Sequence, residues 1–233
     1  MKTLIVGAQG QLGKELLFTC PGGVEATGID IDELDITDLD ATLALLGELA
    51  PQLVINCAAY TAVDGAEAKP DLAVAVNAEG AGNLARAAER LGARLFHVST
   101  DFVFDGESTT PYCPRDEARP LGVYGHSKLA GERRVEEVLP LGSLIVRTSW
   151  LYSAHGGNFV KTMLRLMNER DEVRVVDDQV GTPTWARGLA DVLWAFAGLE
   201  DAHGLYHHSD EGSCSWYEFA CAIYEEGRRR EPA

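Results

Sequence analysis

The chain has 233 residues, of which 46% are hydrophobic and 24% charged, and its formal net charge is −16. This is typical of one globular domain with additional elements, and no apolar run reaches the ~20 residues that a membrane-spanning helix needs. The acidic balance argues against partners such as nucleic acid or a membrane surface. Five scattered cysteines without a Cys-x-x-Cys motif favour a reducing, cytoplasmic location over a disulfide framework or structural zinc site.

The first 150 residues alternate short apolar runs with helix-type segments, beginning with a strand rather than a signal peptide. We expect strands at residues 3–6, 24–29, 53–57, 94–99 and 143–148. We expect helices at residues 11–19, within 36–50, and at 70–91 and 127–139. The strands are rich in Val, Ile and Leu, as buried parallel strands are. The pattern predicts an α/β fold, a Rossmann-type doubly wound parallel sheet with helices on both faces.

The regular alternation of strands and helices ends after residue 150. We expect helices at 158–168, 187–199 and 216–229, short strands at 173–176 and 205–208, and a polar loop at 177–184. These elements should lie over the carboxyl edge of the sheet, where open α/β sheets bind ligands. We therefore divide the chain into an NAD(P)-binding Rossmann domain, 1–150, and a small C-terminal substrate-binding region, 151–233. The latter is interleaved with the last Rossmann strand and helix.

A glycine-rich turn follows the first expected strand, where residues 7–13 read GAQGQLG. Gly7 allows a tight turn, Gly10 lets the backbone approach a pyrophosphate, and Gly13 permits close packing of helix against strand. The helix that begins here offers free N–H groups to phosphates. Because the motif follows a strand and opens a helix, it predicts a dinucleotide site.

An acidic side chain ends the second expected strand. Asp30 lies 17 residues after Gly13, and no Arg or Lys follows it directly. A carboxylate at this place accepts hydrogen bonds from the ribose 2′-OH of NAD and repels the 2′-phosphate of NADP. The sequence therefore favours NADH and leaves the use of NADPH open.

A Tyr-x-x-x-Lys motif stands at the start of a predicted helix. At this spacing Tyr124 and Lys128 share one helix face. A neighbouring ammonium favours the phenolate and lowers the pKa of the phenol, which makes it a better acid–base catalyst. The fourth expected strand ends in Thr100, whose hydroxyl can hydrogen-bond a substrate carbonyl. These three residues form the predicted catalytic set.

The ordered set resembles the extended branch of the short-chain dehydrogenase/reductase superfamily, over nearly the whole chain. Residues 99–106 and 124–132 resemble its sugar-nucleotide enzymes. Residues 58–64, 147–152, 157–159 and 178–184 are similar to the dTDP-4-dehydrorhamnose reductase family. The resemblance implies NAD(P)H-dependent reduction of the C4 ketone of dTDP-4-dehydro-β-L-rhamnose to dTDP-L-rhamnose, the last step of dTDP-rhamnose biosynthesis.

The same resemblance implies a role for each site residue. Tyr124 would protonate the forming alkoxide, Lys128 would tune Tyr124 and bind ribose, and Thr100 would position the carbonyl oxygen. Asp101 and Trp150 would touch the sugar. The residues expected to bind the cofactor are Gly7, Gly10, Gln11, Leu12, Gly13, Asp30, Asp35, Ile36, Ala58, Ala59, Tyr60, Thr100, Tyr124 and Lys128.

Two features depart from the family pattern. Phe102 stands where the family usually has tyrosine, and the chain ends soon after a predicted helix, so we expect a short substrate region. Positive charge for a diphosphate would come from Lys161, Arg165 or Arg187. The histidines form no metal-ligand spacing, so we expect no catalytic metal. The resemblance suggests a homodimer, whose acidic interface could bind a divalent ion.

Two other functions stay open. The first is another sugar-nucleotide reductase, epimerase or dehydratase of the superfamily, although dehydratases commonly carry an Asp-Glu pair where this chain has Asp101 and Phe102. The second is a non-catalytic dinucleotide-binding regulatory subunit, like that of methionine adenosyltransferase. The intact catalytic set favours an enzyme.

Overall fold

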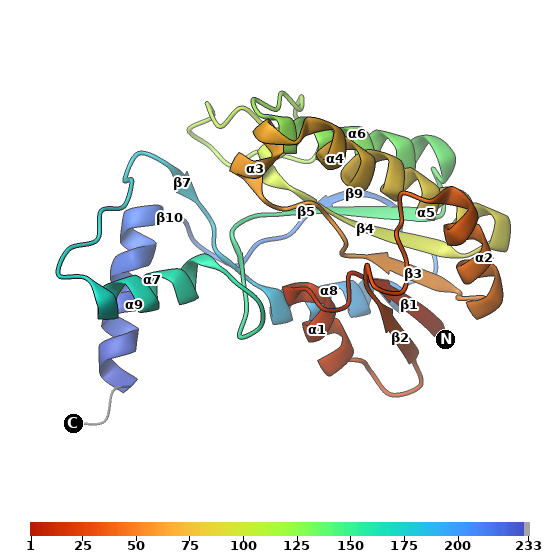
Figure 1. The fold of residues 1–233 in the computed structure, drawn as a ribbon, viewed down its shortest axis with the longest axis horizontal. Coiled ribbons are helices and arrows are strands. Elements are labelled where there is room, and N and C mark those ends of the chain that lie inside the picture. Colours follow the sequence, from red (N-terminus) through yellow and green to blue (C-terminus); the bar gives the residue numbers. More distant parts are fainter. Residues whose placement is uncertain (231–233) are drawn as a thin grey trace.

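The computed structural model describes residues 1–230 and centres on a six-stranded sheet (Figure 1). The strand order is β2-β1-β3-β4-β5-β9, and each neighbouring pair is parallel. The strands are β1 Lys2–Val6, β2 Glu25–Ile29, β3 Leu53–Asn56, β4 Arg94–Thr100, β5 Ser143–Thr148 and β9 Gly204–His207. The predicted doubly wound α/β fold is confirmed.

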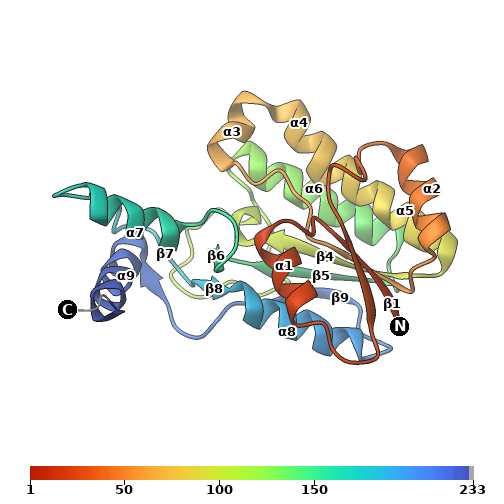
Figure 2. The ribbon, with the colours of Figure 1, turned by 60° about the horizontal axis from the view of Figure 1, so that its bottom comes forward.

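Helices cover both faces of this sheet (Figures 1 and 2). Helices α2 (Leu39–Leu49), α5 (Ala81–Leu91) and α6 (Val123–Val138) lie on one face. Helices α1 (Gln11–Phe18) and α8 (Ala186–Ala197) lie on the other, although they come from opposite ends of the sequence. The indole Nε1 of Trp194 in α8 donates to the Leu16 carbonyl of α1 at 3.1 Å.

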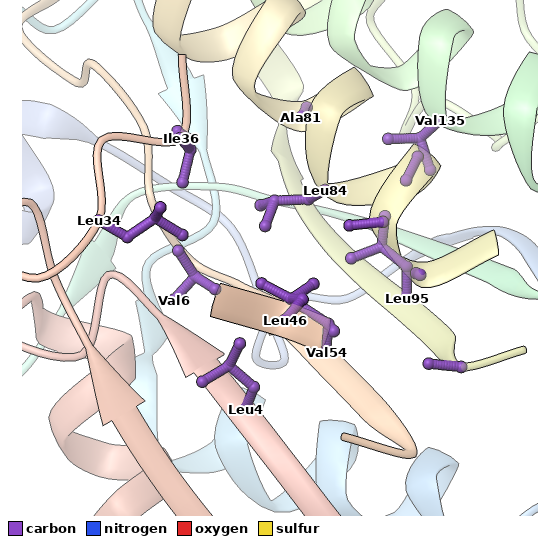
Figure 3. Packing of buried hydrophobic residues seen from close by; sticks show 14 of the residues in the cluster. Leu4, Val6, Leu34, Ile36, Leu46, Val54, Ala81, Leu84, Leu95 and Val135 are labelled. Carbon is purple, nitrogen blue, oxygen red and sulfur yellow. The ribbon is translucent and has the colours of Figure 1, made fainter. Parts of the chain in front are cut away.

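The inner strands β1, β3, β4 and β5 are largely apolar on both faces because both faces are buried there. Along β1, Leu4 and Val6 pack toward α2 and α5, while Ile5 between them packs toward α1 and α8. The same alternation along β4 sends Leu95 to the first face and Phe96 to the second. Figure 3 shows the first of these two cores, where leucines and valines of the sheet meet those of the helices.

The strand order reverses between β1 and β3, the two strands that flank the centre of the fold. At such a reversal the chain leaves neighbouring strands toward opposite faces, which opens a crevice at their carboxyl ends. The crevice is bordered by the glycine turn after β1 and by the loop that follows β3. The topology thus brings both predicted cofactor segments together.

The helical segment before α5 differs from the prediction. Helix α3 (Val63–Ala68) was not predicted. The expected helix at 70–91 is confirmed in its bounds, but a π-helical stretch interrupts its α-helical geometry. The helix consists of α4 (Pro70–Val74), a π-helical turn (η1, Ala75–Gly80) and α5. The π-turn lies where α6 crosses closest, since a Cβ on Gly131 of α6 would stand 2.1 Å from the Asn77 carbonyl oxygen.

Part of the region after residue 150 projects from the sheet (Figure 1), whereas α8 and β9 belong to the sheet layers. Helices α7 (Phe159–Glu169) and α9 (Trp216–Arg230) pack on each other, and we call this pair the arm. Short strands join the arm to the sheet layer: β6 Leu151–Tyr152 pairs with β8 Thr184–Trp185, and β7 Val180–Gly181 with β10 Cys214–Ser215. The expected polar loop at 177–184 therefore includes strand residues. Residues 231–233 of the predicted substrate region lie outside the described chain.

The predicted strand at 173–176 is wrong. Val176 accepts one backbone hydrogen bond, from Tyr217, but the segment joins no ladder within residues 1–230. Val173 and Val175 instead pack against the apolar cluster between α7 and α9. The alternation of apolar residues is thus explained by burial against helices.

Among the described helices, none has the length and apolar character to cross a bilayer.

Candidate active site

The glycine turn fits closely against the loop after β3. Gly7 has a φ of +81°, and a Cβ there would lie 2.6 Å from the Ala58 nitrogen. A Cβ on Gly13 would lie 2.4 Å from the Gly7 carbonyl oxygen, so helix α1 can approach β1 only without a side chain at this position. Gly10 is the N-cap of α1 and provides no side-chain cap. The first amides of α1 are therefore available to an anion.

Asp30 ties the glycine turn to the end of β2. One carboxylate oxygen accepts from the Gln9 nitrogen at 2.8 Å, and the other accepts from the Ile31 nitrogen at 2.9 Å. A carboxylate oxygen has two lone pairs, so each retains acceptor capacity for a ribose hydroxyl. The structure places Asp30 beside the turn, as a ribose ligand requires.

Not every residue on the predicted cofactor list presents its side chain to the crevice. The side chains of Leu12 and Ile36 are buried in the two cores, so only their main chains can meet a ligand. Asp35 is exposed and accepts from the Thr37 nitrogen and hydroxyl. Gln11 begins α1, and its side-chain oxygen accepts from the Asn158 amide at 2.9 Å.

Two buried asparagines hold the loop of Ala58, Ala59 and Tyr60. The side-chain oxygen of Asn56 accepts from the Ala58 nitrogen at 3.0 Å. Asn77, in the π-turn, accepts from the Tyr60 nitrogen at 2.8 Å and donates to the Tyr60 carbonyl at 3.1 Å. Neither role was predicted from the sequence, although an amide side chain inside an otherwise apolar strand end or alanine-rich helix is a signal for it.

The predicted catalytic set meets at the carboxyl end of β4. Thr100 ends this strand, and a single 3-10 turn, η2 (Asp101–Val103), follows it. Helix α6 packs against this turn so closely that a Cβ on Gly125 would lie 2.2 Å from the Phe102 carbonyl oxygen. The buried Lys128 ammonium donates to the Val98 carbonyl at 2.7 Å.

Asn77 also connects the cofactor loop to the catalytic helix. Its amide nitrogen donates to the hydroxyl of Ser127 at 2.9 Å, and that hydroxyl donates to the Tyr124 carbonyl at 2.8 Å. Ser127 is buried and stands directly before Lys128. One hydrogen-bond chain therefore fixes the loop of Tyr60 relative to the Tyr-x-x-x-Lys turn.

Burial dominates the acid–base properties of Tyr124. It raises the pKa of the phenol to about 12, a hydrogen bond with Thr100 opposes the rise, and the charge of Asp101 adds to it. Lys128 does not lower this pKa, so that expectation is wrong for the protein without a ligand; its ammonium is held by Val98 instead. The phenol is therefore protonated at neutral pH and carries the proton that a forming alkoxide would take up.

Two neighbours have shifted pKa values as well. Burial lowers the pKa of Lys128 to about 8, opposed by the charges of Glu132 and Cys57. Burial raises the pKa of Asp101 to about 6, although hydrogen bonds from Thr100 and from backbone amides favour its charged form. Perturbed groups of this kind gather at functional sites.

The residues expected to meet the substrate come from two places: Thr100, Asp101 and Tyr124 from the end of β4, η2 and the start of α6, and Trp150 from the segment after β5. Trp150 has a left-handed backbone with a φ of +46°, and its indole stacks on that of Trp216 with ring centroids 3.5 Å apart. A Cβ on Gly181 would lie 2.6 Å from the Trp150 ring. Phe102 contacts the Tyr124 ring edge to face, with centroids 5.6 Å apart. The unpredicted Trp216 thus covers one face of Trp150.

The cations proposed for a diphosphate already have partners. Lys161 donates to the carbonyls of Ala154 and Gly156, Arg165 pairs with Glu169, and Arg187 pairs with the buried Glu15. Within residues 1–230, no group of three or more His, Cys, Asp and Glu side chains is placed to hold a metal ion.

Comparison with known proteins identifies relatives over almost the full chain. The sequence profile of the RmlD substrate binding domain matches residues 1–232. The chain is 44% identical over 232 residues to a dTDP-4-dehydrorhamnose reductase of Aggregatibacter actinomycetemcomitans, covering 97% of this chain and 79% of that protein.

Solved structures of such reductases match the fold as closely. One from Clostridium acetobutylicum is 47% identical with a TM-score of 0.93, covering 97% of this chain and 80% of that one. One from Bacillus anthracis, solved in complex with NADP, is 42% identical with a TM-score of 0.94 and the same coverage. A UDP-glucose 4-epimerase of Thermus thermophilus shares 19% identity, which shows the fold alone.

Proposed function

The chain belongs to the RmlD substrate binding domain family, and from this premise we propose that it is an NAD(P)H-dependent dTDP-4-dehydrorhamnose reductase. It reduces the C4 ketone of dTDP-4-dehydro-β-L-rhamnose and forms dTDP-L-rhamnose. Its substrate is a nucleotide sugar, and its reaction is a reduction of a ketone to a secondary alcohol.

The observation that carries the proposal is the position of Thr100, Tyr124 and Lys128. They lie together at the carboxyl end of β4, on the same edge of the sheet as the glycine turn and the loop of Ala58. A reductase needs a proton donor close to a dinucleotide, and this fold places both at one edge.

The turn fits a dinucleotide by its shape. Because Gly7 and Gly13 carry no Cβ, the turn packs directly on the Ala58 loop and α1 packs directly on the turn. The N-terminus of α1 carries no side-chain cap that would compete with a phosphate. Asp30 has acceptor capacity for a ribose hydroxyl. When bound, NADH or NADPH supplies the hydride; both coenzymes remain in the proposal, and the acidic Asp30 favours NADH.

The chain's own residues provide the proton and the orientation. The hydroxyl of Thr100 donates a hydrogen bond to the C4 carbonyl oxygen and holds it beside Tyr124. The Tyr124 phenol, protonated at neutral pH, transfers its proton to this oxygen as negative charge develops there. The Lys128 ammonium binds the nicotinamide ribose.

The sugar is held from the η2 turn and from the segment that follows β5. Asp101 accepts hydrogen bonds from sugar hydroxyls, and Trp150 packs an apolar edge against the ring. Reduction is favoured over dehydration because Phe102 occupies the place where a dehydratase commonly carries a second acid. The complete catalytic set favours an enzyme over a purely regulatory dinucleotide-binding protein.

The test follows NAD(P)H absorbance after addition of enzymatically generated dTDP-4-dehydro-β-L-rhamnose. We expect oxidation by the native chain and a loss of kcat of about 10²- to 10⁴-fold in Tyr124→Phe. The variant should bind NADPH as the native chain does, since only the phenolic oxygen is removed. If the native chain binds the coenzyme but oxidises none of it, the proposed function is wrong.

A further inference from the structure

One amide side chain connects the cofactor turn to the arm. Asn158 is the N-cap of α7, where its side-chain oxygen accepts from the Lys161 nitrogen at 3.1 Å. Its amide nitrogen donates to the Ser153 carbonyl at 2.8 Å and to the side-chain oxygen of Gln11 at 2.9 Å. Gln11 is the first residue of α1. The start of the arm is thus bonded directly to the start of the helix whose amides face the phosphate crevice.

A second contact holds the same loop one turn further along α1. The Glu15 carboxylate, only 1% exposed, accepts from the Ser153 hydroxyl at 3.0 Å. It also accepts from the Arg187 guanidinium at 2.9 Å, and His155 lies 3.9 Å away. Gln11 and Glu15 are four residues apart and so share one face of α1. The segment 153–158, which we call the bridge, therefore has two bonds to α1.

The bridge is also packed tightly on both of its sides. Gly156 has a φ of +62°, and a Cβ there would lie 3.1 Å from the Gln11 side chain. From the arm, the Lys161 ammonium donates to the carbonyls of Ala154 and Gly156 at 2.7 and 2.9 Å. Because its polar groups are bonded to α1 on one side and to α7 on the other, the bridge transmits a displacement of Gln11 to the arm.

We propose that Asn158 is a positioning residue that couples coenzyme binding at the glycine turn to the orientation of the arm. The inference rests on the proposed function only in placing the coenzyme on that turn. A bound pyrophosphate fixes the first turn of α1, and hence Gln11; the Gln11–Asn158 bond then fixes the start of α7. The coupling is reciprocal by linkage, so the nucleotide sugar and the coenzyme strengthen each other's binding.

The experiment measures hydrogen–deuterium exchange of residues 153–169, with and without saturating NADPH, in the native chain and in Asn158→Ser. Serine retains the N-cap acceptor but is too short to reach Gln11. We expect NADPH to slow exchange severalfold in the native chain. In Asn158→Ser we expect NADPH to bind but to leave exchange in the bridge and in α7 unchanged. Asn168→Ser, the same substitution at the exposed far end of α7, should behave as the native chain does.

A kinetic readout separates positioning from mere stability. Asn158→Ser should raise KM for the nucleotide sugar several-fold and leave kcat within about twofold, because the catalytic set lies on β4 and α6. Equal NADPH-dependent protection in the native chain and in Asn158→Ser would overturn the proposal, as would NADPH binding without protection in the native chain. Protection without turnover would refute the proposed function alone, and failure to bind either NADPH or NADH would refute both.

Discussion

Gly131 of α6 lies against the main-chain carbonyl of Asn77, with space for a hydrogen but not for a methyl group. A Cβ at this position would be 2.1 Å from the oxygen, so one of the two elements has to move. The contact sets the distance between the π-turn and the helix that carries Tyr124 and Lys128.

We therefore expect Gly131→Ala to lower the free energy of unfolding by about 1–3 kcal/mol, as overpacking does, and to reduce kcat as well. Urea unfolding and steady-state kinetics measure the two effects. The matched control is Gly47→Ala in α2, where a Cβ would meet nothing within 4 Å. It should leave kcat unchanged and stabilise by up to ~1 kcal/mol. Equal effects of the two substitutions on the free energy of unfolding and on kcat would contradict the role of the Gly131–Asn77 contact in placing α6.

Coenzyme selectivity should depend on the charge of Asp30. Asp30→Asn keeps an oxygen for the Gln9 amide but removes the negative charge that a 2′-phosphate would meet. We expect the ratio of kcat/KM for NADPH over NADH to rise about tenfold, corresponding to ~1.4 kcal/mol. The nearby exposed Asp32→Asn serves as control and should change the ratio little. An unchanged ratio in Asp30→Asn would show that the Asp30 carboxylate does not lie beside the ribose of the bound coenzyme.

The raised pKa of Asp101 makes stability depend on pH. Burial lifts it from 3.8 to about 6, so the folded protein favours the neutral acid. The corresponding stabilisation is complete below the unfolded pKa and is lost as pH rises through about 6. Relative to Asp101→Asn, which stays neutral, the native chain should lose stability between about pH 4 and pH 7.5. Urea midpoints that differ by the same amount at both pH values would rule this out.

Lys128 should determine the alkaline limit of activity. Its pKa is lowered to about 8 by burial, so the ammonium that we propose binds the nicotinamide ribose is lost above that pH. We expect kcat/KM, which reports the free enzyme, to fall about tenfold per unit above this pKa. Lys128→Arg keeps its charge throughout this range, and whatever activity it retains should lack the decline. A native profile that stays flat beyond about pH 9 would mean that Lys128 keeps its proton in the free enzyme.

The sheet could be predicted from the sequence because its strands are buried on both faces. A short apolar run such as Leu4-Ile5-Val6, directly followed by a glycine turn, is typical of a buried parallel strand. The strand expected at 173–176 failed for a physical reason: Val173 and Val175 alternate because they pack on the arm, and a partner strand is not encoded locally. The π-turn likewise depends on a tertiary contact, with Gly131 more than 50 residues away.

In the candidate site, too, some features are encoded in the local sequence and others depend on the fold. The glycine spacing and the Tyr-x-x-x-Lys motif are local, so the sequence is sufficient to find them. The Asn77 and Asn158 bonds join residues 17 to 147 positions apart and depend on the fold. The pKa of Tyr124 could not be predicted either, because burial outweighs the neighbouring charge and only the folded chain shows how deeply the phenol lies.

The bond between Trp194 and Leu16 also has a consequence for synthesis on the ribosome. Helix α1 leaves the exit tunnel some 170 residues before α8, the helix that covers the same sheet face with it. Until then Ile5, Ile55 and Phe96 lack the packing contacts that α8 provides in the folded chain. Nascent chains in which α8 has not yet emerged expose apolar surface on this sheet face. Chaperones that bind apolar segments should therefore associate with the translating ribosomes until α8 has emerged.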